Sequence, residues 1–232
     1  MNMATRITAT LFICLLLAGG AHAEASLRFS MNRFDLGSIP PNSVVSHYFW
    51  LRSAGTDTLV IEEIKTGCGC TLMPLDKNWI APGDSMKVDI CWDVKGKIGA
   101  SGSYPYIFTN APDGPSRVYL TGTIVKSPDS LRPVSLKPYI LDLSRFRETS
   151  IDSISFAIRN HSEQDITLSR LSFDVVECEV ILPEMVAAGS VAYGRIKVKE
   201  EFLDKEFKRS FTLKLNDQKN SRITVPVRRK IY

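Results

Sequence analysis

The sequence contains no apolar run long enough to cross a membrane and no strong excess of one charge. Its most apolar run, Leu11–Ala18, is far shorter than the roughly 20 residues that a membrane-spanning helix needs. The 29 basic and 25 acidic side chains give a formal net charge of +4. This balance argues against a nucleic-acid-binding protein and against a membrane-surface protein.

Histidine is scarce as well, and no catalytic motif accompanies the three His residues. We expect His47 to face inward at the edge of a core because it is in phase with Val45, and we expect His161 in a turn. The chain has no Gly-x-Ser-x-Gly nucleophile motif and no phosphate-binding glycine loop. These absences argue against a hydrolase or a transferase, so we predict that the protein is not an enzyme and has no cofactor.

Residues 1–23 have the composition of a signal peptide. Arg6 precedes the apolar run Leu11–Ala18, and Ala21-His22-Ala23 supplies the small residues that signal peptidase needs. We predict a Sec-type signal peptide that is cleaved after Ala23. The mature protein is then expected in the periplasm or outside the cell, without a membrane span.

The rest of the chain is predicted to be almost entirely β-strand, because apolar residues alternate with polar ones. The alternating stretches are 45–51, 59–61, 86–92, 104–108 and 118–120. Turn-forming residues separate the strands. The predicted turns are Pro40–Asn42, Ser53–Gly55, Ala81–Asp84, Gly99–Gly102 and Asn110–Pro115. Only Glu200–Lys208 has a helix-like composition, and we expect a loop or a strand edge there.

The second half of the sequence repeats the first at an offset of about 107 residues. Phe34-Asp35-Leu36 returns as Leu141-Asp142-Leu143, and Phe49–Ser53 returns as Phe156–Asn160. Between the copies, Lys126–Pro133 contains two prolines and small polar residues, as a linker does. Each copy has the length and turn spacing of an immunoglobulin-like sandwich of about seven strands. We therefore predict an all-β protein with two tandem immunoglobulin-like β-sandwich domains after a cleaved signal peptide.

An ordered set of motifs in the first copy resembles a known family. The motifs are Phe34-Asp35-Leu36-Gly37, Phe49–Gly55, Thr66-Gly67-Cys68-Gly69-Cys70-Thr71, Ile80-Ala81-Pro82-Gly83 and Thr121-Gly122-Thr123. They resemble the bacterial domain of unknown function 1573 over about residues 30–125. The resemblance implies an exported bacterial protein with the sandwich fold of hydin-type domains and major sperm protein, and it implies no specific function. We place the domains at 27–126, with the Cys-Gly-Cys, and at 134–232, a degenerate copy without it.

The mature part contains Cys68, Cys70, Cys91 and Cys178, and the sequence leaves their pairing open. A bond between Cys68 and Cys70 needs a turn, which the neighbouring glycines permit, and it would be a reducible, candidate redox centre. The alternative is a structural bridge from one of this pair to Cys91, which needs a bulge or a strand end to aim Cys91 correctly. Cys178 is expected to be unpaired. A soft metal ion held by the Cys-Gly-Cys with Cys91 and His47 is a further alternative, but we predict no metal.

One predicted strand also presents a candidate binding surface. Tyr48, Trp50 and Arg52 lie on the face opposite Phe49 and Leu51, where cross-strand pairing on a solvated face is the simpler explanation. The basic C-terminal end, Arg228-Arg229-Lys230, is expected to be a solvated strand edge.

We predict from these features an exported, non-enzymatic binding or scaffolding protein of the cell envelope. Its partner is expected to be another envelope protein, bound by edge-strand addition or by a loop surface. The alternative is a periplasmic thiol redox or metal-handling protein that uses Cys68 and Cys70.

Overall fold

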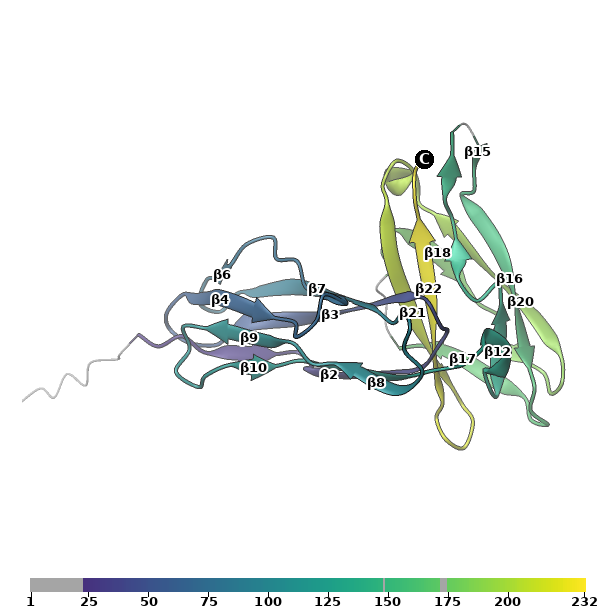
Figure 1. Ribbon diagram of the computed structural model, residues 1–232, viewed down its shortest axis with the longest axis horizontal. Coiled ribbons are helices and arrows are strands. Elements are labelled where there is room, and N and C mark those ends of the chain that lie inside the picture. Colours follow the sequence, from purple (N-terminus) through teal and green to yellow (C-terminus); the bar gives the residue numbers. More distant parts are fainter. Residues whose placement is uncertain (1–22, 148, 172–174) are drawn as a thin grey trace, which may run out of the picture.

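The computed structural model describes residues 23–147, 149–171 and 175–232, and they form an all-β structure (Figure 1). The N-terminal half contains β1 (Leu27–Phe29), β2 (Arg33–Ile39), β3 (Val44–Ser53), β4 (Leu59–Lys65), β5 (Thr71–Leu72), β6 (Trp79–Ile80), β7 (Ser85–Asp93), β8 (Gly99–Ser103), β9 (Tyr106–Thr109), β10 (Ser116–Arg117) and β11 (Tyr119–Ile124). The predicted signal peptide, apart from Ala23, lies outside the described residues.

The C-terminal half contains a second set of strands and two short 3₁₀ helices at Pro128–Ser130 and Glu200–Phe202. The strands are β12 (Val134–Lys137), β13 (Leu141–Asp142), β14 (Arg145–Phe146), β15 (Thr149–Ser150), β16 (Ser153–Asn160), β17 (Ile166–Arg170), β18 (Cys178–Ile181), β19 (Met185–Val186), β20 (Val191–Val198), β21 (Phe207–Leu215) and β22 (Arg222–Arg229). Within the described residues, no helix is long and apolar enough to span a membrane.

Both halves are sandwiches built on the same strand order. In the N-terminal half the sheet β1-β3-β7-β5 packs against β6-β4-β9, and in the C-terminal half β12-β16-β20-β18 packs against β19-β17-β21. The parallel pair β2·β11 of the first half has its counterpart in the parallel pair β13·β22 of the second. One continuous strand, β21, corresponds to β8 and β9 together, which Tyr104-Pro105 separates. The sandwich fold and the internal repeat predicted from the sequence are thus present.

Each sandwich has its own hydrophobic core. The first cluster runs from Ala25 to Ile124 and the second from Val134 to Val227. In β3 and β7 the inward positions are buried and the outward ones are half-buried or exposed, as the sequence alternation predicts. The exception is the outward Ser46, which is buried where it meets Ser210 of the C-terminal half. The domain boundaries stay a prediction, because the two halves also share a sheet.

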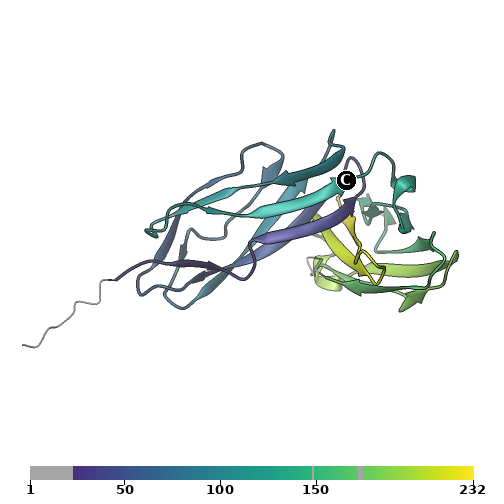
Figure 2. The ribbon, with the colours of Figure 1, turned by 90° about the horizontal axis from the view of Figure 1, so that it is seen from below.

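The shared sheet forms where β2 lies between β11 and β22. Only one residue pair, Ser38↔Ile223, joins β2 to β22. Around it, the Thr224 hydroxyl donates to the Leu36 carbonyl oxygen at 2.6 Å. Gly37 permits this approach, because a Cβ atom there would lie 2.2 Å from the carbonyl oxygen of Arg222. Figures 1 and 2 show the C-terminal half crossing one end of the N-terminal half at this point.

Two local predictions are wrong. Gly99–Gly102, predicted as a turn, forms most of strand β8, because antiparallel backbone pairing with β11 holds a stretch without apolar alternation. The predicted solvated basic end contains Arg229, whose side chain is 0% exposed and donates to the carbonyl oxygens of Leu143 and Leu203. The helix-like stretch Glu200–Lys208 is a short 3₁₀ helix followed by the start of β21.

Candidate functional site

The site is built around the point where β4 leaves its sheet. β4 pairs with β9 as far as Lys65↔Tyr106. The chain then turns away through Thr66 and Gly67, and Gly67 has a φ of +75° that suits glycine. If β4 continued in the same antiparallel register, the residue three positions after Lys65 would lie opposite Ser103 of β8. Because β4 ends before it reaches β8, no strand pairs with the second edge of β8 (Gly99–Ser103) in the described part of the chain. We call the place along this edge that a continued β4 would occupy the β8 lane.

β8 is consequently a free edge among the described residues, since it pairs only with β11. Its sequence is Gly-Ala-Ser-Gly-Ser, with an outward, exposed Ala100 and an inward, buried Ser103. Ile98, which precedes it, is 64% exposed. Tyr104, which follows it, packs its ring against Gly102. The strand thus presents backbone groups among uncharged side chains, which are small within the strand and large at its two ends.

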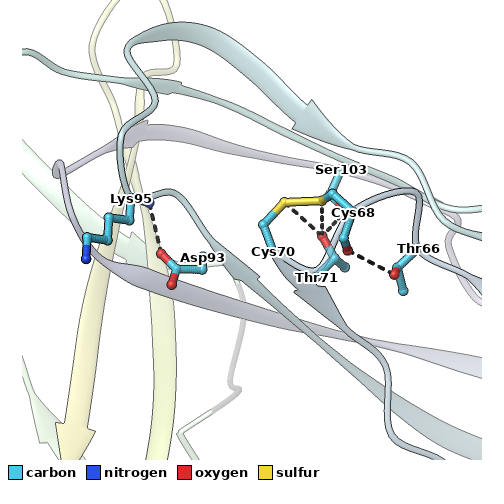
Figure 3. Close-up of a disulfide and its surroundings, with 7 residues drawn as sticks. All are labelled: Thr66, Cys68, Cys70, Thr71, Asp93, Lys95 and Ser103. Carbon is cyan, nitrogen blue, oxygen red and sulfur yellow. Dashed lines mark hydrogen bonds between the residues drawn. A yellow bond between two sulfur atoms is a disulfide. The ribbon is translucent and has the colours of Figure 1, made fainter.

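The Cys-Gly-Cys turn lies beside Thr71 and Ser103, the last residue of β8 (Figure 3). Cys68 and Cys70 form a disulfide, with Cys68 exposed and Cys70 half-buried against the N-terminal core. The hydroxyl oxygen of Thr71 lies 3.9 Å from each sulfur atom and 2.7 Å from the hydroxyl oxygen of Ser103. Of the two pairings that the sequence leaves open, the structure has the one within the turn, and both glycines lie in open space.

Cys91 is a free thiol and does not face this turn. β7 has no bulge at Cys91, so its side chain points to the outer face while Trp92 points into the core. That outer face meets the C-terminal half, where Arg209 lies beside the thiol. Burial raises the pKa of Cys91, and Arg209 opposes this effect only in part. A bridge from Cys91 to the Cys-Gly-Cys is therefore absent.

On the outer face of β3 and β7, the contact with the C-terminal half includes two polar clusters. The backbone N–H of Ser46 donates to the hydroxyl oxygen of Ser210, and the backbone N–H of Ser210 donates to the hydroxyl oxygen of Ser46, both at 2.8 Å. Arg209 lies 3.4 Å from a carboxylate oxygen of Asp89 and 2.8 Å from one of Glu177. β3 of the N-terminal half thus covers the edge of β21 at Ser210.

Tyr48, Trp50 and Arg52 share the outer face of β3, as predicted. The exposed fraction of Trp50 is 44%. The ammonium group of Lys87 lies 4.4 Å from the centre of the Tyr48 ring, and Arg28 of β1 lies directly opposite Arg52. A groove of about 520 Å³ runs beside Trp50 and Arg52. The three residues lie on the opposite face of β3 from the core.

Neither described histidine joins the Cys-Gly-Cys. His47 is buried, with its ring stacked 3.7 Å from that of Phe34. His161 is exposed, and its Nε2 lies 2.7 Å from the hydroxyl oxygen of the buried Ser135. The sequence does not predict this pair, because the two residues are 26 positions apart. In the described part of the chain, no group of three or more His, Cys, Asp or Glu side chains is placed to hold a metal ion.

Cys178 is also free, and it is buried in the C-terminal core. Burial and the nearby Glu177 carboxylate raise the pKa of the thiol to about 12. The thiol therefore stays protonated at neutral pH and is a poor nucleophile.

Three solved structures illustrate what the chain is similar to, and no curated protein matches it. A protein of unknown function from Porphyromonas gingivalis W83 is 12% identical, with 88% of this chain and 99% of that chain covered and a TM-score of 0.37. The PapD-like domain 7 of human CEP192 is 9% identical, with 55% and 99% covered and a TM-score of 0.37. The CupB2 chaperone of Pseudomonas aeruginosa is 13% identical, with 86% and 98% covered and a TM-score of 0.31.

A family model gives the more specific result. The model described as "Protein of unknown function (DUF1573)" matches residues 27–124. The match spans the N-terminal half, including the Cys-Gly-Cys turn and β8, as the sequence resemblance predicts. Over residues 27–124, this chain is similar to the DUF1573 family.

Proposed function

We propose that the chain is an exported, non-enzymatic binding or scaffolding protein of the cell envelope. In this proposal β8 accepts an extended segment of another envelope protein as an added strand. The observation that carries the proposal is the free edge of β8 beside the lane that β4 vacates.

A free strand edge offers unpaired N–H and C=O groups to any extended chain. Proteins usually protect such an edge with lysine, proline, a bulge or a covering loop. Residues 99–103 include neither a charged residue nor proline, and β8 pairs with β11 without a register shift. An edge of this kind is suited to strand addition, in which main-chain hydrogen bonds supply the affinity.

The proposed compartment rests on residues 1–23. Their basic start, apolar run and Ala-His-Ala site are those of a Sec-type signal peptide that is cleaved after Ala23. The disulfide between Cys68 and Cys70 supports an oxidising compartment such as the periplasm, where such bonds persist.

The second candidate function is a periplasmic thiol redox protein. The exposed position of Cys68 favours it, since an exposed disulfide is accessible to an attacking thiol. The metal-handling version is less favoured, because both sulfur atoms are engaged in the disulfide and neither is a free thiolate.

A matched pair of lysine variants tests strand addition. Ala100→Lys places a charge on the free edge, whereas Thr123→Lys places the same charge opposite it on β11, which is paired on both sides. The probe is the labelled peptide Thr-Val-Thr-Val-Thr-Val, with binding followed by fluorescence anisotropy and by hydrogen exchange of residues 99–103.

The peptide is expected to bind the unmodified protein and to slow hydrogen exchange at β8. Ala100→Lys should weaken binding at least tenfold, which corresponds to about 1.4 kcal/mol, and Thr123→Lys should leave binding within about twofold, or 0.4 kcal/mol. Equal binding by both variants, or no binding by the unmodified protein, would overturn the proposal.

A further inference from the structure

We propose that the β8 lane and the Cys68–Cys70 disulfide form one site, which docks an extended segment that carries a cysteine and captures it as a mixed disulfide with Cys68. This inference rests on the proposed function, because the segment must first add to β8. It names the chemical class of the partner: an extended peptide with one free thiol.

The register of β4 places the disulfide at one end of the docked segment. A strand in the lane that continues the direction of β4 begins opposite Ser103 and runs toward Gly99. The disulfide is linked to Ser103 through the Thr71 hydroxyl, which contacts both sulfur atoms. The first residue of such a segment therefore lies beside the disulfide, and later residues lie farther from it.

The two sulfur atoms differ in access. Cys68 is exposed, whereas Cys70 is half-buried and packs against the N-terminal core. A thiolate arriving along the lane therefore attacks Cys68, and Cys70 leaves. The Thr71 hydroxyl lies 3.9 Å from the Cys70 sulfur. When the Ser103 hydroxyl donates to Thr71 in the bond that joins them, the single Thr71 proton is available to the leaving thiolate.

The exchange balances without another reagent. The incoming thiol loses its proton, and its sulfur forms a bond to the sulfur of Cys68. The bond between Cys68 and Cys70 breaks, and Cys70 leaves as a thiolate that takes up a proton from solvent. The partner cysteine is oxidised from thiol to disulfide, and Cys70 is reduced from disulfide to thiol.

The test uses the chain without residues 1–23 and three thiol probes. The probes are Cys-Thr-Val-Thr-Val-Thr-Val, the same peptide with its cysteine at the C-terminus, and glutathione. Mixed disulfides are trapped with acid and mapped by mass spectrometry. The N-terminal cysteine peptide is expected to modify Cys68 at least tenfold faster than the other two probes. Ala100→Lys should remove this advantage, and Thr123→Lys should retain it.

A second variant keeps the test independent of disulfide stability. Cys70→Ser leaves Cys68 as a free thiol, which should react with the N-terminal cysteine peptide when that peptide carries an activated disulfide. This reaction should again depend on Ala100. The matched variant Cys68→Ser should react much more slowly at Cys70, because that side chain is half-buried.

The outcomes separate this inference from the proposed function. If the cysteine-free peptide protects β8 but the cysteine peptide reacts no faster than glutathione, strand addition stands and the capture is overturned. If neither peptide binds, both proposals fall. Modification that maps to Cys70 instead of Cys68 also overturns the capture.

Discussion

The two halves of this molecule share one strand order, but the corresponding strand edges differ: the edge of β21 is covered by the other half, and the edge of β8 is unpaired among the described residues. In the C-terminal half, Ser210 of β21 donates its backbone N–H to Ser46 of the other half. In the N-terminal half, the corresponding strand β8 pairs with β11 alone among the described residues. One fold thus uses the same edge twice, once to join its own halves and once, in our proposal, to receive a partner.

The side chains of the two strands fit these different roles. β21 contributes Phe207, Phe211 and Leu213 to its core, so burial of apolar surface anchors it. No residue of β8 belongs to the N-terminal core. The buried Ser103 is held instead by its hydrogen bond to Thr71. β8 is therefore held mainly by its backbone hydrogen bonds to β11, and its other edge is unpaired in the described residues.

The largest effect is expected from a residue that only the C-terminal half has. Arg229→Met removes the donors that serve the buried carbonyl oxygen of Leu143, the half-buried carbonyl oxygen of Leu203 and the Asp152 carboxylate. Loss of one partner in a buried charged network costs about 3–5 kcal/mol. We expect urea unfolding to shift by that amount for the C-terminal half and to leave the N-terminal core folded.

The neighbouring arginine provides the control for this prediction. The side chain of Arg228 is 50% exposed and pairs with Asp142 at 2.6 Å. Arg228→Met should cost no more than about 1 kcal/mol, as exposed ion pairs do. If the two variants unfold at the same urea concentration, the buried guanidinium does not stabilise the C-terminal half as we describe.

The next effect concerns the junction between the halves. Gly37→Ala places a Cβ atom 2.2 Å from the Arg222 carbonyl oxygen at a φ of +66°, so β2 must separate from β22. We expect a loss of about 2–3 kcal/mol and a larger radius of gyration in X-ray solution scattering. Gly83→Ala, at a φ of +82° in open space, should cost only about 1 kcal/mol. Equal effects of the two variants would show that the strand contact does not hold the halves together.

The smallest effect is a change in acid sensitivity. Burial raises the pKa of Asp142, but the hydrogen bonds from Arg228 and Ser144 outweigh burial and hold it below its usual value. The resulting stabilisation is present above the unfolded pKa of about 3.9 and is lost as the pH falls through the folded value.

Asp142→Asn should therefore flatten the loss of stability below about pH 4, measured as the urea midpoint at several pH values. Arg228→Met should flatten it in the same direction, because it removes the principal partner of the carboxylate. An unchanged acid slope in both variants would contradict this account.

The parts of the fold that the sequence predicts are those where side chains carry the information. In β3 and β7, apolar residues occupy every second position because one face is buried, so alternation locates both strands. The repeated Phe-Asp-Leu segment lies within β2, and the Leu-Asp-Leu segment contains β13. These two strands occupy equivalent places beside β11 and β22. The outer position of Tyr48, Trp50 and Arg52 follows from the same alternation.

The features of the fold that the sequence does not predict depend on contacts between segments that lie far apart in the chain. Residues 99–103 resemble a turn because glycine and serine carry no alternation, and only pairing with β11 makes them a strand. Arg229 resembles a solvated residue until carbonyl oxygens from β-strand connections around it are known. The choice between the two cysteine pairings required the direction of the Cys91 side chain, which depends on the absence of a bulge in β7.

The composition of β8 has a consequence for selectivity. A strand of glycine, alanine and serine offers hydrogen bonds to any extended chain but no pockets that distinguish one side chain from another. Binding of this kind is promiscuous with respect to sequence. Discrimination among partners would then depend on where a single sulfur atom lies along the segment, so unrelated proteins could qualify by sharing one cysteine at the start of an exposed strand.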